Sequence, residues 1–239
     1  MLLFVAAFLL PGCSPPDSSS LVRMEGYLFD SPSPEEDEEG VEGARGDVWD
    51  DEGEVLADID RPFSSYLTYY RVEGLPPQER VHIRFSSDDS VTTILTGWTP
   101  DETLYVDRGA FHLFGRDDAL RLARNWTMGD EAAHDFGPEQ PDQGGLVVGS
   151  LAFPEEREGT KLWAVDVEGG EHLARVQDPL GDAFEGTGTG SDGTFAFVGL
   201  PAGPLDMFVE RPGEERSDES FRTWVQEDAI TSLAGFQIQ

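Results

Sequence analysis

The stretch that decides the fold is GTGTGSDGTFAFVGLPAGPLDMFV, residues 186–209. Apolar side chains stand two apart on both sides of its Gly-Leu-Pro segment, and strict alternation is typical of a strand with one buried face. Two such strands with a short Pro-containing turn between them predict a β-hairpin. We expect these side chains to face the core: Phe195, Phe197, Leu205, Met207 and Val209. The intervening residues Asp206, Phe208 and Glu210 should face outward.

The same order of residues occurs earlier in the chain. Residues 70–76 read YRVEGLP and residues 195–201 read FAFVGLP, and an alternating run follows the first copy at 81–85. A pattern that recurs at such a distance predicts two copies of one structural module. We therefore expect a second hairpin across residues 70–85.

Residues 144–239 resemble the carboxypeptidase regulatory-like module, a transthyretin-like β-sandwich. The resemblance is carried by the Asp192-Gly193 turn, the alternating aromatic strand after it, and the segment Leu200-Pro201-Ala202-Gly203. The first copy is similar more loosely, because Pro77-Gln78 stands in place of the Ala-Gly pair. The resemblance implies an all-β protein with two transthyretin-like, or prealbumin-like, β-sandwich modules. Such modules serve adhesion, spacing or carbohydrate contact in exported proteins, and they are not themselves the peptidase.

The two modules are expected at residues 21–114 and 144–239, joined by a short helix and a linker at 115–143. Within that connection, residues 117–126 favour a helix, because two Asp residues can cap its start and Leu122 and Trp126 lie four apart on one face. We expect this helix to dock against a sandwich.

The N-terminus carries the features of an export signal. Residues 2–10 form an apolar run, too short for the roughly 20 residues that span a bilayer but typical of a signal peptide. The Leu10-Pro11-Gly12-Cys13 sequence that follows resembles the lipobox of bacterial lipoproteins. The resemblance implies a signal peptide at 1–12, a lipid on Cys13 and a tether at 13–20. The alternatives are an ordinary signal peptide or a buried N-terminal strand.

The charge of the chain excludes some partners. It contains 48 acidic residues against 16 Lys and Arg, a net charge of −32. Such a surface repels phosphate backbones and anionic headgroups, so we expect no nucleic-acid partner and no membrane attachment through a basic patch. The single cysteine excludes an intramolecular disulfide.

Catalytic motifs are missing from the sequence. The four histidines are scattered and form no His-Glu-x-x-His motif, and there is no Gly-x-Ser-x-Gly. We therefore expect a protein that is not an enzyme and has no cofactor, with calcium as the one candidate, because hard cations prefer oxygen ligands clustered on loops. Two acidic groups offer them: Asp178, Asp182 and Asp192, and Asp47, Asp50, Asp51 and Glu52. The alternative for both groups is a set of solvated turn carboxylates.

These observations predict a lipid-anchored, non-catalytic binding or structural protein of the bacterial cell envelope, at the outer membrane or cell surface. One alternative is a carbohydrate-binding protein, for which the candidate aromatic residues are Trp98, Tyr105, Trp163 and Phe208. A second alternative is a calcium-stabilised adhesion or spacer domain. The expected partners are the membrane, through the lipid, and a glycan or another envelope protein.

Overall fold

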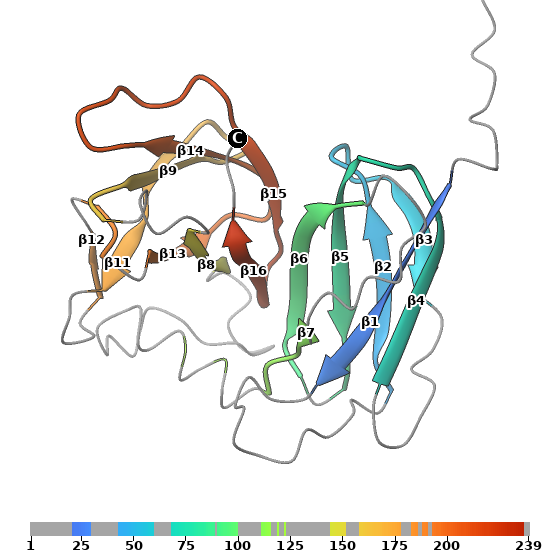
Figure 1. Ribbon diagram of the computed structural model, residues 1–239. Helices are drawn as coiled ribbons and strands as arrows, with labels where there is room; N and C mark the ends of the chain where they lie inside the picture. Colours follow the sequence, from blue (N-terminus) through green and yellow to red (C-terminus); the bar gives the residue numbers. More distant parts are fainter. Residues whose placement is uncertain are drawn as a thin grey trace, which may run out of the picture.

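The computed structural model describes residues 21–29, 43–59, 68–88, 90–99, 111–115, 119, 122, 144–151, 158–177, 183–185, 188–190 and 193–236. This part of the chain is almost entirely β-structure (Figure 1), which confirms the all-β fold class. The signal peptide, Cys13, the tether, Tyr105 and Trp126 lie outside the described residues. No helix in the described ranges has the length and apolar character needed to cross a membrane.

The first half of the chain supplies β1 (Val22–Phe29), β2 (Arg45–Trp49), β3 (Val55–Ile59), β4 (Thr68–Leu75), β5 (Arg80–Ser86), β6 (Thr92–Trp98) and β7 (Phe111–His112). The second half supplies β8 (Gly145–Leu151), β9 (Lys161–Val165), β10 (Glu171–Leu173), β11 (Arg175–Gln177), β12 (Ala183–Glu185), β13 (Thr194–Leu200), β14 (Gly203–Glu210), β15 (Phe221–Val225) and β16 (Ala229–Phe236).

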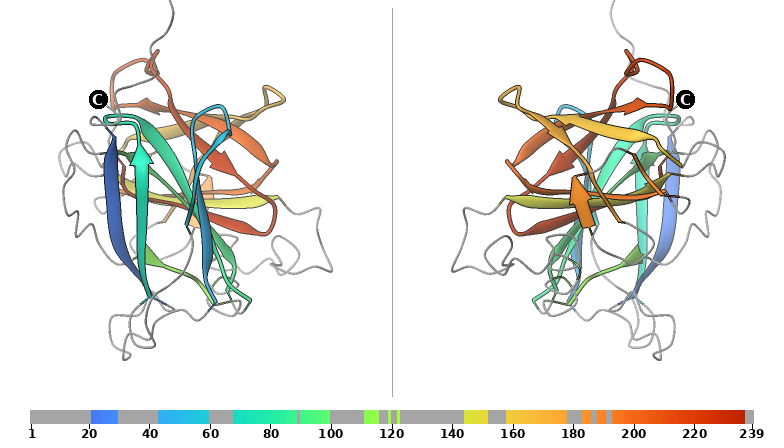
Figure 2. Two further views of the ribbon diagram at one scale, coloured as in Figure 1. Left: turned by 90° about the vertical axis from the view of Figure 1, so that its right-hand side faces the viewer. Right: turned by 90° about the vertical axis from the view of Figure 1, so that its left-hand side faces the viewer.

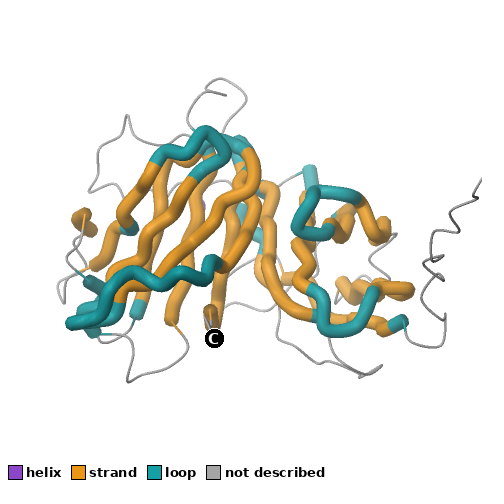
Figure 3. Tube along the Cα trace, turned by 90° about the horizontal axis from the view of Figure 1, so that it is seen from above, coloured by secondary structure: helices purple, strands orange, loops and turns teal. Residues whose placement is uncertain are grey.

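These strands form two β-sandwiches that lie side by side when seen from above (Figure 3). The first packs the sheet β4-β1-β7 against β6-β5-β2-β3, around a core that contains Tyr70, Val72, Ile83 and Phe85. The second packs the sheet β10-β9-β14-β15 against β12-β11-β13-β8, around a core that contains all five side chains predicted to face inward. Asp206, Phe208 and Glu210 alternate with them and are partly exposed, so the predicted strand phase is confirmed.

The two predicted hairpins are wrong. In each copy of the repeat, the chain crosses from one sheet to the other at the Gly-Leu-Pro segment: β4 pairs with β1 whereas β5 pairs with β2 and β6, and β13 pairs with β8 whereas β14 pairs with β9 and β15. Both strands of a copy point their apolar side chains into the same core, from opposite sides. Alternation therefore identifies each strand and its buried face but not the sheet to which it belongs.

The crossing begins with the same backbone in both copies. Gly74 and Gly199 hold equivalent positions with φ of 83° and 71°, in the left-handed region that favours glycine. Four residues later in each copy, Gln78 and Gly203 also have positive φ, of 57° and 137°. These two φ values lie in different regions, so the copies share their backbone at Gly74 and Gly199 but not at Gln78 and Gly203.

The two sandwiches share one sheet. β16 comes from the second half of the chain, yet it pairs in parallel with both β6 and β8 and so completes a sheet of nine strands, β12-β11-β13-β8-β16-β6-β5-β2-β3. The side views show how far this arrangement twists: the strands of the first sandwich run upright, and most of those of the second run across them (Figure 2).

A small apolar cluster covers this shared sheet near β16. It joins Val91, Leu146, Ala196 and Ile230 to Ala119, with Leu122 packed at its margin. Ala119 and Leu122 are helical, and the amide of Ala119 donates to the carbonyl of Gly115 (2.9 Å). The described part of the predicted helix thus packs where the two sandwiches meet, and the rest of it lies outside the described residues.

Candidate functional site

Two of the predicted aromatic residues come together on the outer face of the second sandwich. β9 and β14 are antiparallel neighbours, and Trp163 lies directly opposite Phe208. Their neighbours Leu162 and Met207 point into the core, so the two rings face outward and are half-buried. Directly opposed side chains on one face of a sheet are in contact range. The outer face therefore presents an aromatic pair.

Arg216 lies over this pair. It belongs to the 211–220 loop between β14 and β15, and its guanidinium carbon is 5.1 Å from the Phe208 ring centroid and 6.0 Å from that of Trp163. Arg216 Nη1 also donates to Glu171 Oε1 on β10 (2.8 Å). The loop is held back along β14, because Ser217 N donates to the Val209 carbonyl (2.8 Å) and Val209 N donates to Ser217 Oγ (3.1 Å). Arg216 thus links three strands of the outer face.

Glu210 fixes the orientation of the indole. Trp163 Nε1 donates to Glu210 Oε2 (2.9 Å), and the ammonium of Lys161 donates to Glu210 Oε1. The hydrogen bond from Lys161, followed by that from Trp163, lowers the pKa of Glu210 below its usual value. The carboxylate is therefore ionised at neutral pH and acts as an acceptor.

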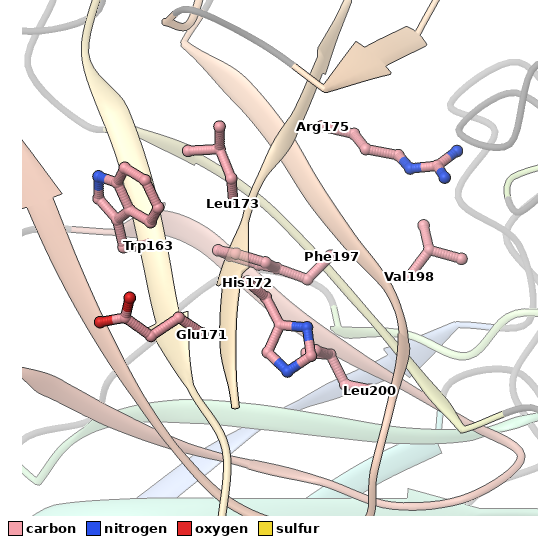
Figure 4. A pocket seen from close by; sticks show the side chains of 8 residues that line it. All are labelled: Trp163, Glu171, His172, Leu173, Arg175, Phe197, Val198 and Leu200. Carbon is pink, nitrogen blue, oxygen red and sulfur yellow. The ribbon is translucent and has the colours of Figure 1, made fainter. Parts of the chain in front are cut away.

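A pocket of about 320 Å³ opens beside Trp163 at the edge of the sandwich (Figure 4). Its lining combines apolar and hydrogen-bonding side chains: Trp163, Glu171, His172, Leu173, Arg175, Phe197, Val198 and Leu200. The surface exposed in this pocket is more polar than apolar, unlike the mainly apolar walls of a typical small-molecule site. These lining residues include no Ser, Thr or Cys nucleophile.

The imidazole of His172 is held at this pocket by Asp166. His172 Nε2 lies 2.7 Å from Asp166 Oδ2, while Asp166 Oδ1 accepts from the amides of Glu168 and Gly170 (both 2.8 Å). The hydrogen bond from His172 is the main cause of a lowered pKa at Asp166, and the amide of Gly170 adds to it. A short turn thus presents a pre-oriented imidazole at the pocket.

The other predicted site residues are not part of this face. Trp98 lies at the end of β6 in the first sandwich, 52% exposed, with the Arg80 guanidinium 5.6 Å from its ring. Tyr105, Cys13 and the calcium candidates Asp178, Asp182 and Asp192 lie outside the described residues. The lipid and the calcium at these positions remain predictions.

The second acidic group is engaged in internal contacts. Asp47 accepts from Arg84 Nε (3.0 Å), and Asp51 accepts from Arg80 Nε (2.8 Å). Asp50 Oδ1 accepts from the amides of Glu52 and Glu54 (3.0 and 2.8 Å) and so closes the β2–β3 turn. Among the described residues, no group of three or more His, Cys, Asp and Glu residues is placed to hold a metal ion.

Comparisons with known proteins give only remote similarity. No family model and no curated protein matches the chain, so the carboxypeptidase regulatory-like assignment stays a resemblance. Among solved structures, the Bacillus anthracis TIE protein is 8% identical over 90% of this chain and 33% of that chain, with a TM-score of 0.30. A streptococcal ancillary pilin is 13% identical over 91% of this chain and 63% of that chain, with a TM-score of 0.25. BcpA, the major pilin subunit of Bacillus cereus, is 7% identical over 90% of this chain and 99% of that chain, with a TM-score of 0.30.

This chain therefore spans about a third of the first of these structures and less than two thirds of the second. At these TM-scores the similarity carries no argument about function. Only the residues of this chain itself bear on what it does.

Proposed function

We propose that the chain is an exported, non-catalytic binding and spacing protein of the bacterial cell envelope, held at a membrane by a lipid on Cys13. The observation that carries the spacing role is the shared sheet. β16 is hydrogen-bonded to β6 on one side and to β8 on the other, so backbone hydrogen bonds fix the two sandwiches relative to each other. Two domains on a flexible linker would reorient freely. A block of this kind on a short Ser/Pro-rich tether would hold its outer faces away from the membrane.

The lipid predicts that Cys13→Ser changes where the protein is found. Each acyl methylene buried in a bilayer contributes about 0.8 kcal/mol, so a cysteine with several acyl chains is attached almost irreversibly. We expect the wild-type protein in the membrane fraction, and the variant in soluble fractions or as uncleaved precursor. Fractionation with mass spectrometry of the N-terminal peptide measures both. A soluble wild-type protein with an unmodified Cys13 would contradict the lipoprotein assignment but not the spacing role.

A second candidate function is carbohydrate binding by the outer face of the second sandwich. The specific observation is the opposed pair Trp163 and Phe208 next to the pocket that holds His172 and Glu171. Aromatic rings offer flat apolar surface, and the carboxylate of Glu171, on the same face of the sheet as Trp163, offers an acceptor for hydroxyl groups. This combination fits a sugar ring with one apolar face.

Replacement of Trp163 by alanine tests the carbohydrate-binding candidate. We expect the full chain to bind at least one sugar on a glycan array, and Trp163→Ala to weaken that binding at least tenfold in a calorimetric titration. Trp98→Ala is the matched control, because Trp98 is an exposed tryptophan on the other sandwich, and it should leave the affinity unchanged. A glycan whose affinity depends on Trp98 and not on Trp163 would place the site elsewhere.

A further inference from the structure

The two sandwiches also meet through a partly buried cluster of side chains, which we call the joint. It consists of Asp51, Arg80, His82, Thr96, Thr223 and Trp224. The core of the first sandwich takes Val81, Ile83 and Phe85 from β5, so the intervening His82 faces the opposite side of the shared sheet. That side is covered by β15 of the second sandwich. His82 is 0% exposed although it lies outside both cores.

A chain of hydrogen bonds crosses the joint through His82. His82 Nε2 lies 3.0 Å from Asp51 Oδ1, His82 Nδ1 lies 2.9 Å from Thr96 Oγ1, and Thr96 Oγ1 lies 2.6 Å from Thr223 Oγ1. An ionised carboxylate can only accept, so the imidazole donates from Nε2 and is free to accept at Nδ1. The hydroxyl of Thr96 then donates to His82, and that of Thr223 donates to Thr96. The neutral imidazole thus sets the direction of every bond in the chain.

Trp224 closes the joint over His82. Its ring centroid is 6.3 Å from that of His82 and 5.9 Å from that of Trp49, with edge-on packing at both. The fit is tight, because a Cβ on Gly53 would lie 2.7 Å from Trp224 Cη2. Trp224 Nε1 is buried and has no hydrogen-bond partner among the described residues, and such a buried donor lowers the stability of the contact. The joint is therefore closely packed and contains one buried donor without a partner in the described part of the chain.

We propose that the joint is acid-labile: protonation of His82 places a charge in the closed joint and releases β15 from the first sandwich. A proton on Nδ1 makes both ring nitrogens donors, so the hydroxyl of Thr96 must turn to accept from the ring and donate to Thr223, whose own hydroxyl proton then needs another acceptor. The imidazolium would also carry a charge into a site closed by two tryptophans. When β15 is released, water reaches the imidazolium, and the desolvation penalty of the buried charge is removed.

The surrounding charges affect the pKa of His82 in the closed joint. Asp51 and Asp50 on the β2–β3 turn favour the imidazolium, and Arg80 on β5 opposes it. Asp51 also accepts from Arg80, which already compensates much of its charge. The nearby Arg84 pairs with Asp47 of β2, and Arg222 of β15 pairs with Asp206 of β14. Burial outweighs the attraction of Asp51 and lowers the pKa of His82 to about 4.

The sign of the effect follows from this lowered pKa. An open joint returns His82 toward its ordinary pKa of about 6.5, so the open state binds the proton more tightly than the closed state. The closed joint is therefore favoured above about pH 6.5, and the open fraction rises as the pH falls from there toward about 4. Between pH 7 and pH 4.5 the ratio of open to closed joint should increase roughly fiftyfold.

Hydrogen exchange on the full-length chain tests the proposal. After correction for the intrinsic pH dependence of exchange, protection of the β15 amides should fall tens of fold between pH 7 and pH 4.5, while that of β1 and β4 stays constant. His82→Gln, which cannot take up a proton, should make β15 protection independent of pH. His172→Gln is the matched control, because His172 also pairs with a carboxylate but lies outside the joint, and it should keep the wild-type response.

If the His82→Gln variant does not fold, a second measurement on the wild-type protein still tests the proposal. In the wild-type protein, the imidazole resonance of His82 and the indole resonance of Trp224 should change with a common midpoint well below pH 6.5. An ordinary midpoint for His82, unchanged β15 protection in the wild type, or loss of the response in His172→Gln would each overturn the proposal.

Discussion

Replacing Phe197 by alanine is expected to lower the free energy of unfolding of the second sandwich by about 3–5 kcal/mol, the usual cost of deleting a buried phenylalanine. The side chain is 2% exposed and packs edge-on against Phe195, with ring centroids 6.1 Å apart. A typical domain is stable by only about 5–15 kcal/mol. Denaturant unfolding of the full chain, followed by circular dichroism, should therefore show an early transition that belongs to the second sandwich.

Phe208→Ala is the matched control for Phe197→Ala. It removes the same ring from the outer face of β14, where Phe208 is partly exposed and contacts Arg216. The loss of an exposed cation–π contact costs about 0.5–1 kcal/mol, so the unfolding midpoint should change little. Equal losses in the two variants would mean that the faces of this sandwich are assigned incorrectly.

The second large effect is expected at Ile230, in the strand that the two sandwiches share. Ile230 is 0% exposed, and it stands opposite Thr93 of β6 and Leu146 of β8. Ile230→Asp places an unpaired carboxylate in an apolar cluster, which costs roughly 3–5 kcal/mol. Because β16 belongs to both halves of the sheet, we expect both sandwiches to lose stability together, as measured by hydrogen exchange in β5 and in β13.

Val167→Asp controls for the added charge. Val167 is 59% exposed, so the same substitution there should change stability by no more than about 0.5 kcal/mol. If Ile230→Asp destabilised the second sandwich and left the exchange of β5 unchanged, β16 would not connect the two halves of the sheet.

The sequence was enough to predict the β class and the buried face of β14. These features depend on local alternation and on a repeated Gly-Leu-Pro segment, which can be identified without knowledge of strand partners. The hairpins were predicted wrongly because a strand that turns back beside its neighbour and one that crosses to the facing sheet have the same alternation. Gly74 and Gly199 mark the crossing, but glycine also occurs in ordinary hairpin turns.

The sites were less predictable than the fold. The sequence makes Trp163 and Phe208 candidates, but only the β9–β14 register places them opposite each other. The joint could not be predicted, because Asp51, His82, Thr96 and Thr223 come from four separate segments and form no motif. A signal was present at β5, where Arg80, His82 and Arg84 alternate with Val81, Ile83 and Phe85. Three polar residues on one face predict an outer surface, and nothing in the sequence indicates that β15 covers it.

The position of β16 has a consequence for the order in which the protein assembles. A chain made or exported from its N-terminus exposes β6 and then β8 long before β16 exists to lie between them. Pairings between residues so distant in sequence form slowly, because a long loop must close first. Each sandwich must therefore gain much of its structure with one open edge, and β6 and β8 are unprotected against pairing with other chains in that interval. Between the emergence of β8 and that of β16, these two edges are open to pairing with another chain.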